Sequence, residues 1–256
     1  MENNSFGDES AGKKRRDLLL PASILVAAVL IAGSLVYSAG KRSSEKNLAQ
    51  ISSGNEEQTA GIENLVTVNS DDHIRGDMDA PVQVVEFSDM ECPFCKTFHD
   101  TMQKVMLKYG DKVAWIYRHA PIDSLHPKSR KEAEATECAA SLGGNIKFWA
   151  YLDRLMEITP SNNGLDPAEL PRIAEYVGLD KAKFESCLSS GKYADKIQAD
   201  LENAVRSGMI GTPYSIILIN GKVRYSIPGG LNFEESRPGE PYMDQIISEL
   251  IEESGQ

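Results

Sequence analysis

Short apolar runs along the chain predict four strands of one β-sheet. Residues 82–87, 113–118 and 214–219 form three such runs, with the length and composition of buried strands. An Asn-Gly pair follows the third run and is a strong hairpin signal, so residues 222–227 are expected to pair back as the fourth strand.

Stretches with helical periodicity separate the second strand from the third. The expected helices cover residues 128–142, 146–158, 167–177, 181–188 and 193–206. A further amphipathic stretch, residues 244–253, is expected to close the chain as a helix on the sheet. These elements predict an α/β fold built from residues 64–121 and 209–256, with an all-helical domain inserted at 122–208.

The N-terminal region has a different pattern. Residues 1–17 are polar and contain the basic cluster Lys13-Lys14-Arg15-Arg16, and residues 18–39 contain no charge. At about 1.5 Å per helical residue, this second segment is long enough to cross a hydrocarbon core of ~30 Å. The basic cluster predicts a cytoplasmic tail and an extracytoplasmic C-terminal domain, held at the cell membrane by a single-pass signal anchor. A cleaved signal peptide is the alternative. Residues 40–63 are polar and predict a flexible linker.

The charge of the chain excludes some classes of partner. The 256 residues carry a formal net charge of −11. An acidic chain is unsuited to binding nucleic acid or docking on anionic lipid, so we expect neither.

The candidate chemistry lies in Cys92-Pro93-Phe94-Cys95, directly after the first predicted strand. If a helix begins near Cys92, its sulfur lies beside unpaired N–H groups and the positive end of the helix dipole. Both favour the thiolate, which is the nucleophilic form. Pro93 suits the first helical turn, where its missing N–H costs nothing. Cys95, one turn further on, is suited to resolving a mixed disulfide on Cys92.

A pair of cysteines at this spacing is also half of a common zinc site. The two remaining cysteines, Cys138 and Cys187, are isolated and do not form a second pair. His99 is the one extra ligand candidate nearby, and we interpret it as a residue on the exposed face of the helix. We therefore expect no metal and no other cofactor.

A second motif, Gly211-Thr212-Pro213, stands at the start of the third strand, where a proline is tolerated. Together with the cysteine pair, it resembles the DsbA branch of the thioredoxin superfamily, over about residues 66–251. The resemblance is closest to members with a single membrane anchor. It implies a thioredoxin-like α/β fold with an inserted all-helical domain, preceded by one N-terminal transmembrane helix.

The resemblance assigns roles at the two motifs. Cys92 becomes the attacking cysteine and Cys95 the resolving one. Pro213 becomes a proline with a cis peptide bond facing the cysteines. Thr212 then offers its backbone to an extended substrate segment.

The resemblance also assigns roles around the pair. Pro93 and Phe94 tune the reduction potential and contact the substrate. Glu86 matches a buried acid that takes or relays the proton of Cys95, and a buried carboxyl has the raised pKa that this role requires. The alternative for Glu86 is a residue at the edge of the strand that reaches solvent.

The isolated cysteines have a structural interpretation. In an oxidising compartment two leftover cysteines tend to pair, so we expect a structural disulfide between Cys138 and Cys187. Two buried free thiols are the alternative, and a second redox relay is less favoured because neither cysteine has an activating neighbour in the sequence.

The leading functional hypothesis is a protein disulfide oxidase that donates the Cys92–Cys95 disulfide to reduced or unfolded exported proteins. The resemblance implies a membrane reoxidase of the DsbB or VKOR type as its partner, and we expect a monomer. A reductase or isomerase that uses the same pair is one alternative. A non-catalytic metal-binding or peptide-binding module is the other.

Overall fold

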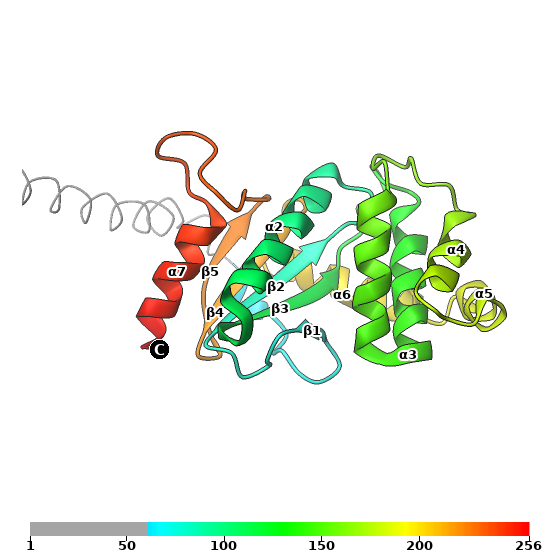
Figure 1. Cartoon of the computed structure of the whole chain (residues 1–256), viewed down its shortest axis with the longest axis horizontal. Coiled ribbons are helices and arrows are strands. Elements are labelled where there is room, and N and C mark those ends of the chain that lie inside the picture. Colours follow the sequence, from blue (N-terminus) through cyan, green and yellow to red (C-terminus); the bar gives the residue numbers. More distant parts are fainter. Residues whose placement is uncertain (1–60, 256) are drawn as a thin grey trace, which may run out of the picture. The chain divides into compact units, whose positions relative to one another are not determined.

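The computed structural model describes residues 61–255, and a five-stranded sheet lies at their centre (Figure 1). In chain order the strands are β1 (His73–Arg75), β2 (Val82–Ser88), β3 (Val113–His119), β4 (Tyr214–Ile219) and β5 (Lys222–Pro228). Their order across the sheet is β1-β3-β2-β4-β5. Strands β2 and β3 are parallel, and the other neighbours are antiparallel.

Six α-helices lie among the described residues, with two short 3₁₀ helices, η1 (Ile62–Asn64) and η2 (Gly110–Lys112). The α-helices are α2 (Pro93–Tyr109), α3 (Ser129–Ile158), α4 (Glu169–Tyr176), α5 (Lys181–Ser190), α6 (Ala194–Arg206) and α7 (Met243–Ser254). The backbone of α3 is non-helical at Gly144, with φ 72° and ψ −170°. The break that the sequence predicts between residues 142 and 146 is therefore confirmed.

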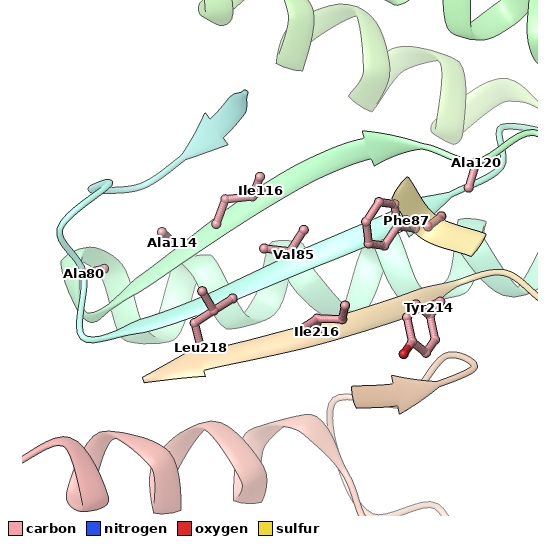
Figure 2. Packing of buried hydrophobic residues seen from close by; sticks show 10 residues of the cluster. Ala80, Val85, Phe87, Ala114, Ile116, Ala120, Tyr214, Ile216 and Leu218 are labelled. Atoms are coloured by element: carbon pink, nitrogen blue, oxygen red, sulfur yellow. The ribbon is translucent and has the colours of Figure 1, made fainter. Parts of the chain in front are cut away.

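The three central strands are buried on both faces. On one face, Val85, Ile116 and Ile216 form an apolar cluster, and their side chains project together from β2, β3 and β4 (Figure 2). Ala204 of α6 is part of this cluster. On the other face, Trp115 is buried against α2, and α7 packs on β2.

The position of α6 refines the division of the chain. Helices α3 to α6 lie between β3 and β4 in the sequence, where the helical insertion is expected. Helix α6, the last helix of the expected insertion, packs on β2 and β3 and so covers one face of the sheet. Helices α3, α4 and α5 pack on one another and lie to the side of the sheet (Figure 1).

The predicted membrane anchor, residues 18–39, lies outside the described residues, as do the tail 1–17 and all but the last three residues of the expected linker. Within residues 61–255, no helix has both the length and the apolar character needed to cross a bilayer.

Candidate active site

The candidate site is built where β2 ends and α2 begins. β2 ends at Ser88, a turn follows, and Cys92 caps the N-terminus of α2 with Pro93 in its first turn. The carbonyl oxygen of Cys92 accepts the N–H of Lys96 at 3.1 Å, which closes that turn. Cys92 therefore has the position that favours a thiolate.

The sulfur of Cys92 faces the second motif. Its Sγ lies 3.4 Å from the carbonyl oxygen of Thr212, and the Thr212–Pro213 peptide bond is cis. The pKa of the Cys92 thiol is lowered to about 6, mainly by a hydrogen bond from the Cys95 thiol. Backbone N–H groups of Cys95 and Phe94 add to this effect, and burial opposes it.

The pKa of the Cys95 thiol shifts in the opposite direction. It is fully buried, and burial raises the pKa of its thiol well above the ordinary value. The backbone N–H of Asp89 donates to its Sγ at 3.4 Å. Near neutral pH the pair thus consists of one thiolate, Cys92, and one thiol that donates to it.

Glu86 lies on β2 with its side chain toward α2, and it is fully buried. The indole N–H of Trp115 donates to one of its carboxyl oxygens at 2.8 Å. Burial raises the pKa of Glu86 to about 7, although hydrogen bonds from Ser88 and Trp115 oppose the rise. Its environment is that of a buried acid, not of a strand edge in solvent.

The surface beside the cysteines is apolar. Pro93 is exposed, and Phe94 is 69% exposed although it is a large aromatic residue. Ile210, two residues before Thr212, is 92% exposed. Pro93, Phe94 and Ile210 are therefore accessible to solvent.

Gly230 is a site residue that sequence reasoning missed. The N–H of Gly229 bonds to the carbonyl oxygen of Pro213 at 2.8 Å, which ties the end of β5 to the proline. A Cβ at Gly230 would lie 3.2 Å from the carbonyl oxygen of Phe94 and 3.4 Å from Cγ of Pro213. The sequence around Gly230 signals only a turn, so nothing in it indicates this close approach.

Three buried polar residues near the cysteines were also missed or misplaced. Asp89 and Glu91 are fully buried in the turn before Cys92. The prediction that His99 lies on an exposed face is wrong, because α3 covers it and its Nε2 lies 2.9 Å from Oδ1 of Asp153. Among residues 61–255, no group of three or more His, Cys, Asp or Glu side chains is arranged to hold a metal ion.

The two remaining cysteines form a disulfide. Cys138 of α3 and Cys187 of α5 are bonded, with their Cα atoms 5.8 Å apart. This is the pairing that the sequence predicts. Cys92 and Cys95, in contrast, are free thiols in this structure.

A comparison with known families identifies the family to which this chain belongs. A family model described as "Thioredoxin" matches residues 68–230, a range that contains both motifs. The chain belongs to the thioredoxin family.

Solved structures add detail to the fold. DsbA2 of Pseudomonas aeruginosa is 28% identical and covers 64% of this chain and 89% of its own, with a TM-score of 0.55. Alpha-DsbA1 of Wolbachia pipientis is 23% identical, covers 74% and 95%, and has a TM-score of 0.61. Oxidised BdbD of Bacillus subtilis is 22% identical, covers 78% and 100%, and has a TM-score of 0.59. The last two are similar in fold alone. The described residues thus have a thioredoxin-like α/β fold with a helical insertion, similar to proteins of the DsbA type.

Curated relatives have a different organisation. Na(+)/H(+) antiporter NhaA 3 of Salinispora tropica is 36% identical over 162 residues, which is 63% of this chain and 24% of the antiporter. NhaA 1 of Salinispora arenicola is 33% identical over 174 residues, or 68% and 25%. This chain thus spans about a quarter of the length of the curated relatives that it matches.

Proposed function

We propose that this protein is a thiol-disulfide oxidoreductase that acts as a disulfide oxidase through Cys92 and Cys95. The observation that carries the proposal is the contrast between the two sulfurs. Cys92 has a pKa of about 6 at a helix N-terminus, and Cys95 is a buried thiol with a raised pKa. A stabilised Cys92 thiolate is a good leaving group, which makes the oxidised pair a disulfide donor.

The reaction starts from the oxidised pair. A substrate thiolate attacks Sγ of Cys92, the bond to Cys95 breaks, and Cys95 leaves as a thiolate that takes up a proton. The second thiol of the substrate, once deprotonated, then attacks the mixed disulfide and releases the Cys92 thiolate. The substrate loses two electrons and two protons. The enzyme takes up both electrons and one proton, ending as the Cys92 thiolate and the Cys95 thiol, and the other proton goes to solvent.

Two neighbouring groups support the step in which Cys95 leaves. The N–H of Asp89, 3.4 Å from Sγ of Cys95, stabilises the developing negative charge. Glu86, with a pKa of about 7, holds a proton near neutral pH and is suited to supplying it to the Cys95 sulfur.

We propose that the substrates are unfolded exported proteins. Phe94 and Ile210 offer an apolar surface to exposed hydrophobic segments. Thr212, whose carbonyl oxygen lies beside Cys92, offers its backbone to an extended chain.

For the cellular setting, we propose a domain held outside the cytoplasm by a membrane anchor at residues 18–39, acting as a monomer and reoxidised by a DsbB-like or VKOR-like membrane protein. The support is the charge-free segment behind a basic cluster. The names of the curated relatives, which are antiporters, are consistent with a related domain held at a membrane.

The reduction potential, measured in glutathione buffers, tests this function. A potential near that of DsbA, about −120 mV, supports the oxidase, and one near that of thioredoxin, about −270 mV, supports a reductase. The variant Cys95→Ser should trap mixed disulfides on Cys92, and Cys92→Ser should trap none. A metal-binding or peptide-binding module would trap none with either variant.

A further inference from the structure

The turn that leads to Cys92 is bonded to the helical insertion, both in the loop before α3 and at the start of α3. The carboxylate of Asp89 accepts the N–H of Ile122 at 2.7 Å and lies 3.0 Å from Nδ1 of His126. The N–H of Met90 donates to the hydroxyl of Ser129, at the start of α3, at 3.1 Å. These bonds join the turn to two consecutive segments, and Glu91 joins it to a third.

Glu91 makes the most extensive of these connections. Its buried carboxylate accepts the N–H groups of Asn163 (2.7 Å), Gly164 (3.2 Å) and Leu165 (3.3 Å). Its own carbonyl oxygen accepts the N–H of Asn162 at 2.7 Å. Glu91, the residue directly before Cys92, thus accepts hydrogen bonds from the backbone of four consecutive residues, 162–165, in the loop between α3 and α4.

The loop that Glu91 binds has an unusual backbone. Ser161, Asn162 and Asn163 all have positive φ, at 63°, 54° and 65°. Positive φ is uncommon for any residue other than glycine, and three in succession turn neighbouring N–H groups toward one acceptor. A buried carboxylate at position 91 is the group that satisfies these donors.

A second acid completes the arrangement. Glu132 of α3 is buried, and burial, followed by its hydrogen bond with Glu91, raises its pKa to about 9. Near neutral pH Glu132 is therefore protonated, and its carboxyl is suited to donating to the side chain of Glu91. The carboxylate of Asp89 adds to this rise, and the ammonium of Lys128 opposes it.

The same turn sets the environment of both sulfurs. The N–H of Cys92 donates to the carbonyl oxygen of Asp89 at 3.2 Å, and the N–H of Asp89 donates to Sγ of Cys95 at 3.4 Å. We propose that Glu91 is a positioning residue, which fixes this turn to the loop at 162–165 and thereby sets the geometry of Cys92 and Cys95. The inference rests on the proposed function and deepens it, because it makes the helical insertion a determinant of how strongly the pair oxidises.

The test is Glu91→Gln in the full-length chain. An amide replaces one acceptor oxygen by a donor that faces the N–H groups of the loop, so the turn loosens. We expect the ionisation midpoint of Cys92, followed by thiolate absorbance, to rise by about half a unit or more. The equilibrium constant for oxidising glutathione should fall about tenfold, which is about 30 mV for a two-electron couple.

Glu137→Gln is the matched control. Glu137 is a buried acid on the same helix α3, where it bonds to His73 and His119 and makes no hydrogen bond to the turn. This variant should leave the ionisation of Cys92 and the equilibrium constant unchanged, even if its unfolding temperature falls. Equal shifts in both variants would mean that Glu91 acts only through general stability, and the inference would be wrong.

A second variant covers the case in which Glu91→Gln does not fold. Ser129→Ala removes only the acceptor of the Met90 N–H, and it should shift both quantities in the same direction by a smaller amount. Wild-type values in Ser129→Ala and in any folded Glu91→Gln protein would overturn the inference. Failure of the wild-type protein to exchange with glutathione would instead overturn the proposed function, while the ionisation of Cys92 would still report on Glu91.

Discussion

Trp115 donates its indole N–H to the carboxyl group of Glu86 over 2.8 Å, on the face of the sheet that α2 covers. This is the one strong donor from the neighbouring strand β3, and it does not offset the cost of burying a carboxylate. The pKa of Glu86 therefore stays raised, at about 7, against an ordinary value of 4.5. Glu86 can therefore hold and give up a proton near neutral pH. Its buried carboxylate, formed at higher pH, destabilises the folded protein.

That cost gives a pH-dependent prediction for Glu86→Gln. Because the folded protein raises the pKa of Glu86, its protonated carboxyl favours folding fully below about pH 4.5, and this contribution is lost as the pH rises to about 7. Glutamine does not ionise and still accepts the Trp115 N–H. At pH 8 the variant should be more stable by up to about 3 kcal/mol, with little difference at pH 4. Urea unfolding of the reduced protein at both pH values measures this, and equal stabilities at pH 8 would contradict it.

Ionisation of Cys92 changes stability with pH in the opposite direction to ionisation of Glu86. Its folded pKa of about 6 lies below the ordinary 9, so its thiolate stabilises the reduced protein above pH 9, and this contribution is lost as the pH falls through about 6. Alkylation of the reduced protein by iodoacetamide should follow a single ionisation with a midpoint near pH 6. The Cys92→Ser variant should show no such rise below pH 8, because the thiol of Cys95 stays protonated. A midpoint near 9 in the wild type would exclude an activated thiolate.

The parts of the fold that the sequence predicts are those with a local signal. The hairpin of β4 and β5 is predicted from an Asn-Gly turn, and both residues, Asn220 and Gly221, have the positive φ that such a turn needs. The start of α2 at Pro93 is also predicted from a local signal, because proline is tolerated in the first turn of a helix. These signals depend on neighbouring residues and not on the rest of the fold.

The parts that the sequence does not predict depend on distant partners. Strand β1 has only three residues, His73–Arg75, too few for their alternating polarity to be a signal, and it is a strand because it pairs with β3. Glu91 is buried because it binds backbone groups more than seventy residues later in the chain. Nothing near either position in the sequence indicates its partner, so only the folded structure identifies them.

Gly230 gives a steric prediction. A valine there would press on the Phe94 carbonyl and on Pro213, whose atoms lie 3.2 and 3.4 Å from the first added carbon. We expect Gly230→Val to destabilise the protein by about 1–3 kcal/mol and to slow disulfide exchange, because the two motifs are forced apart. Gly211→Ala is the control, since a Cβ there has no atom within 4 Å. Unfolding free energies and exchange rates of both variants decide the question, and a neutral Gly230→Val would show that the loop yields freely.

The disulfide between Cys138 and Cys187 should stabilise the insertion without setting the redox properties of the site. It joins residues 49 positions apart, so its removal in Cys138→Ala/Cys187→Ala should cost about 3–4 kcal/mol of unfolding free energy. The reduction potential of the Cys92–Cys95 pair should stay unchanged. A changed potential would contradict this prediction, and thiol labelling of Cys138 and Cys187 during turnover would then distinguish electron exchange between the pairs from loosening of the insertion.

The exposed apolar residues beside the cysteines should bind substrate proteins, a role separate from the tuning of the reduction potential that the resemblance assigns to Phe94. Phe94→Ser removes an aromatic side chain that is 69% exposed beside Cys92. We expect KM for an unfolded, reduced protein to rise about tenfold, which corresponds to about 1.4 kcal/mol of lost apolar contact. The rate with a small thiol such as dithiothreitol should change far less, since it has no hydrophobic segment to dock.

Leu107→Ser is the matched control for Phe94→Ser. Leu107 lies on the same helix α2 and is 89% exposed, but it is near the end of the helix that lies away from the cysteines. If substrate proteins dock on the apolar surface beside Cys92, Leu107→Ser leaves KM unchanged while Phe94→Ser and Ile210→Ser both raise it. Equal effects of all three variants would mean that exposed apolar area anywhere on the domain attracts unfolded chains, and the docking surface assigned to Phe94 and Ile210 would be wrong.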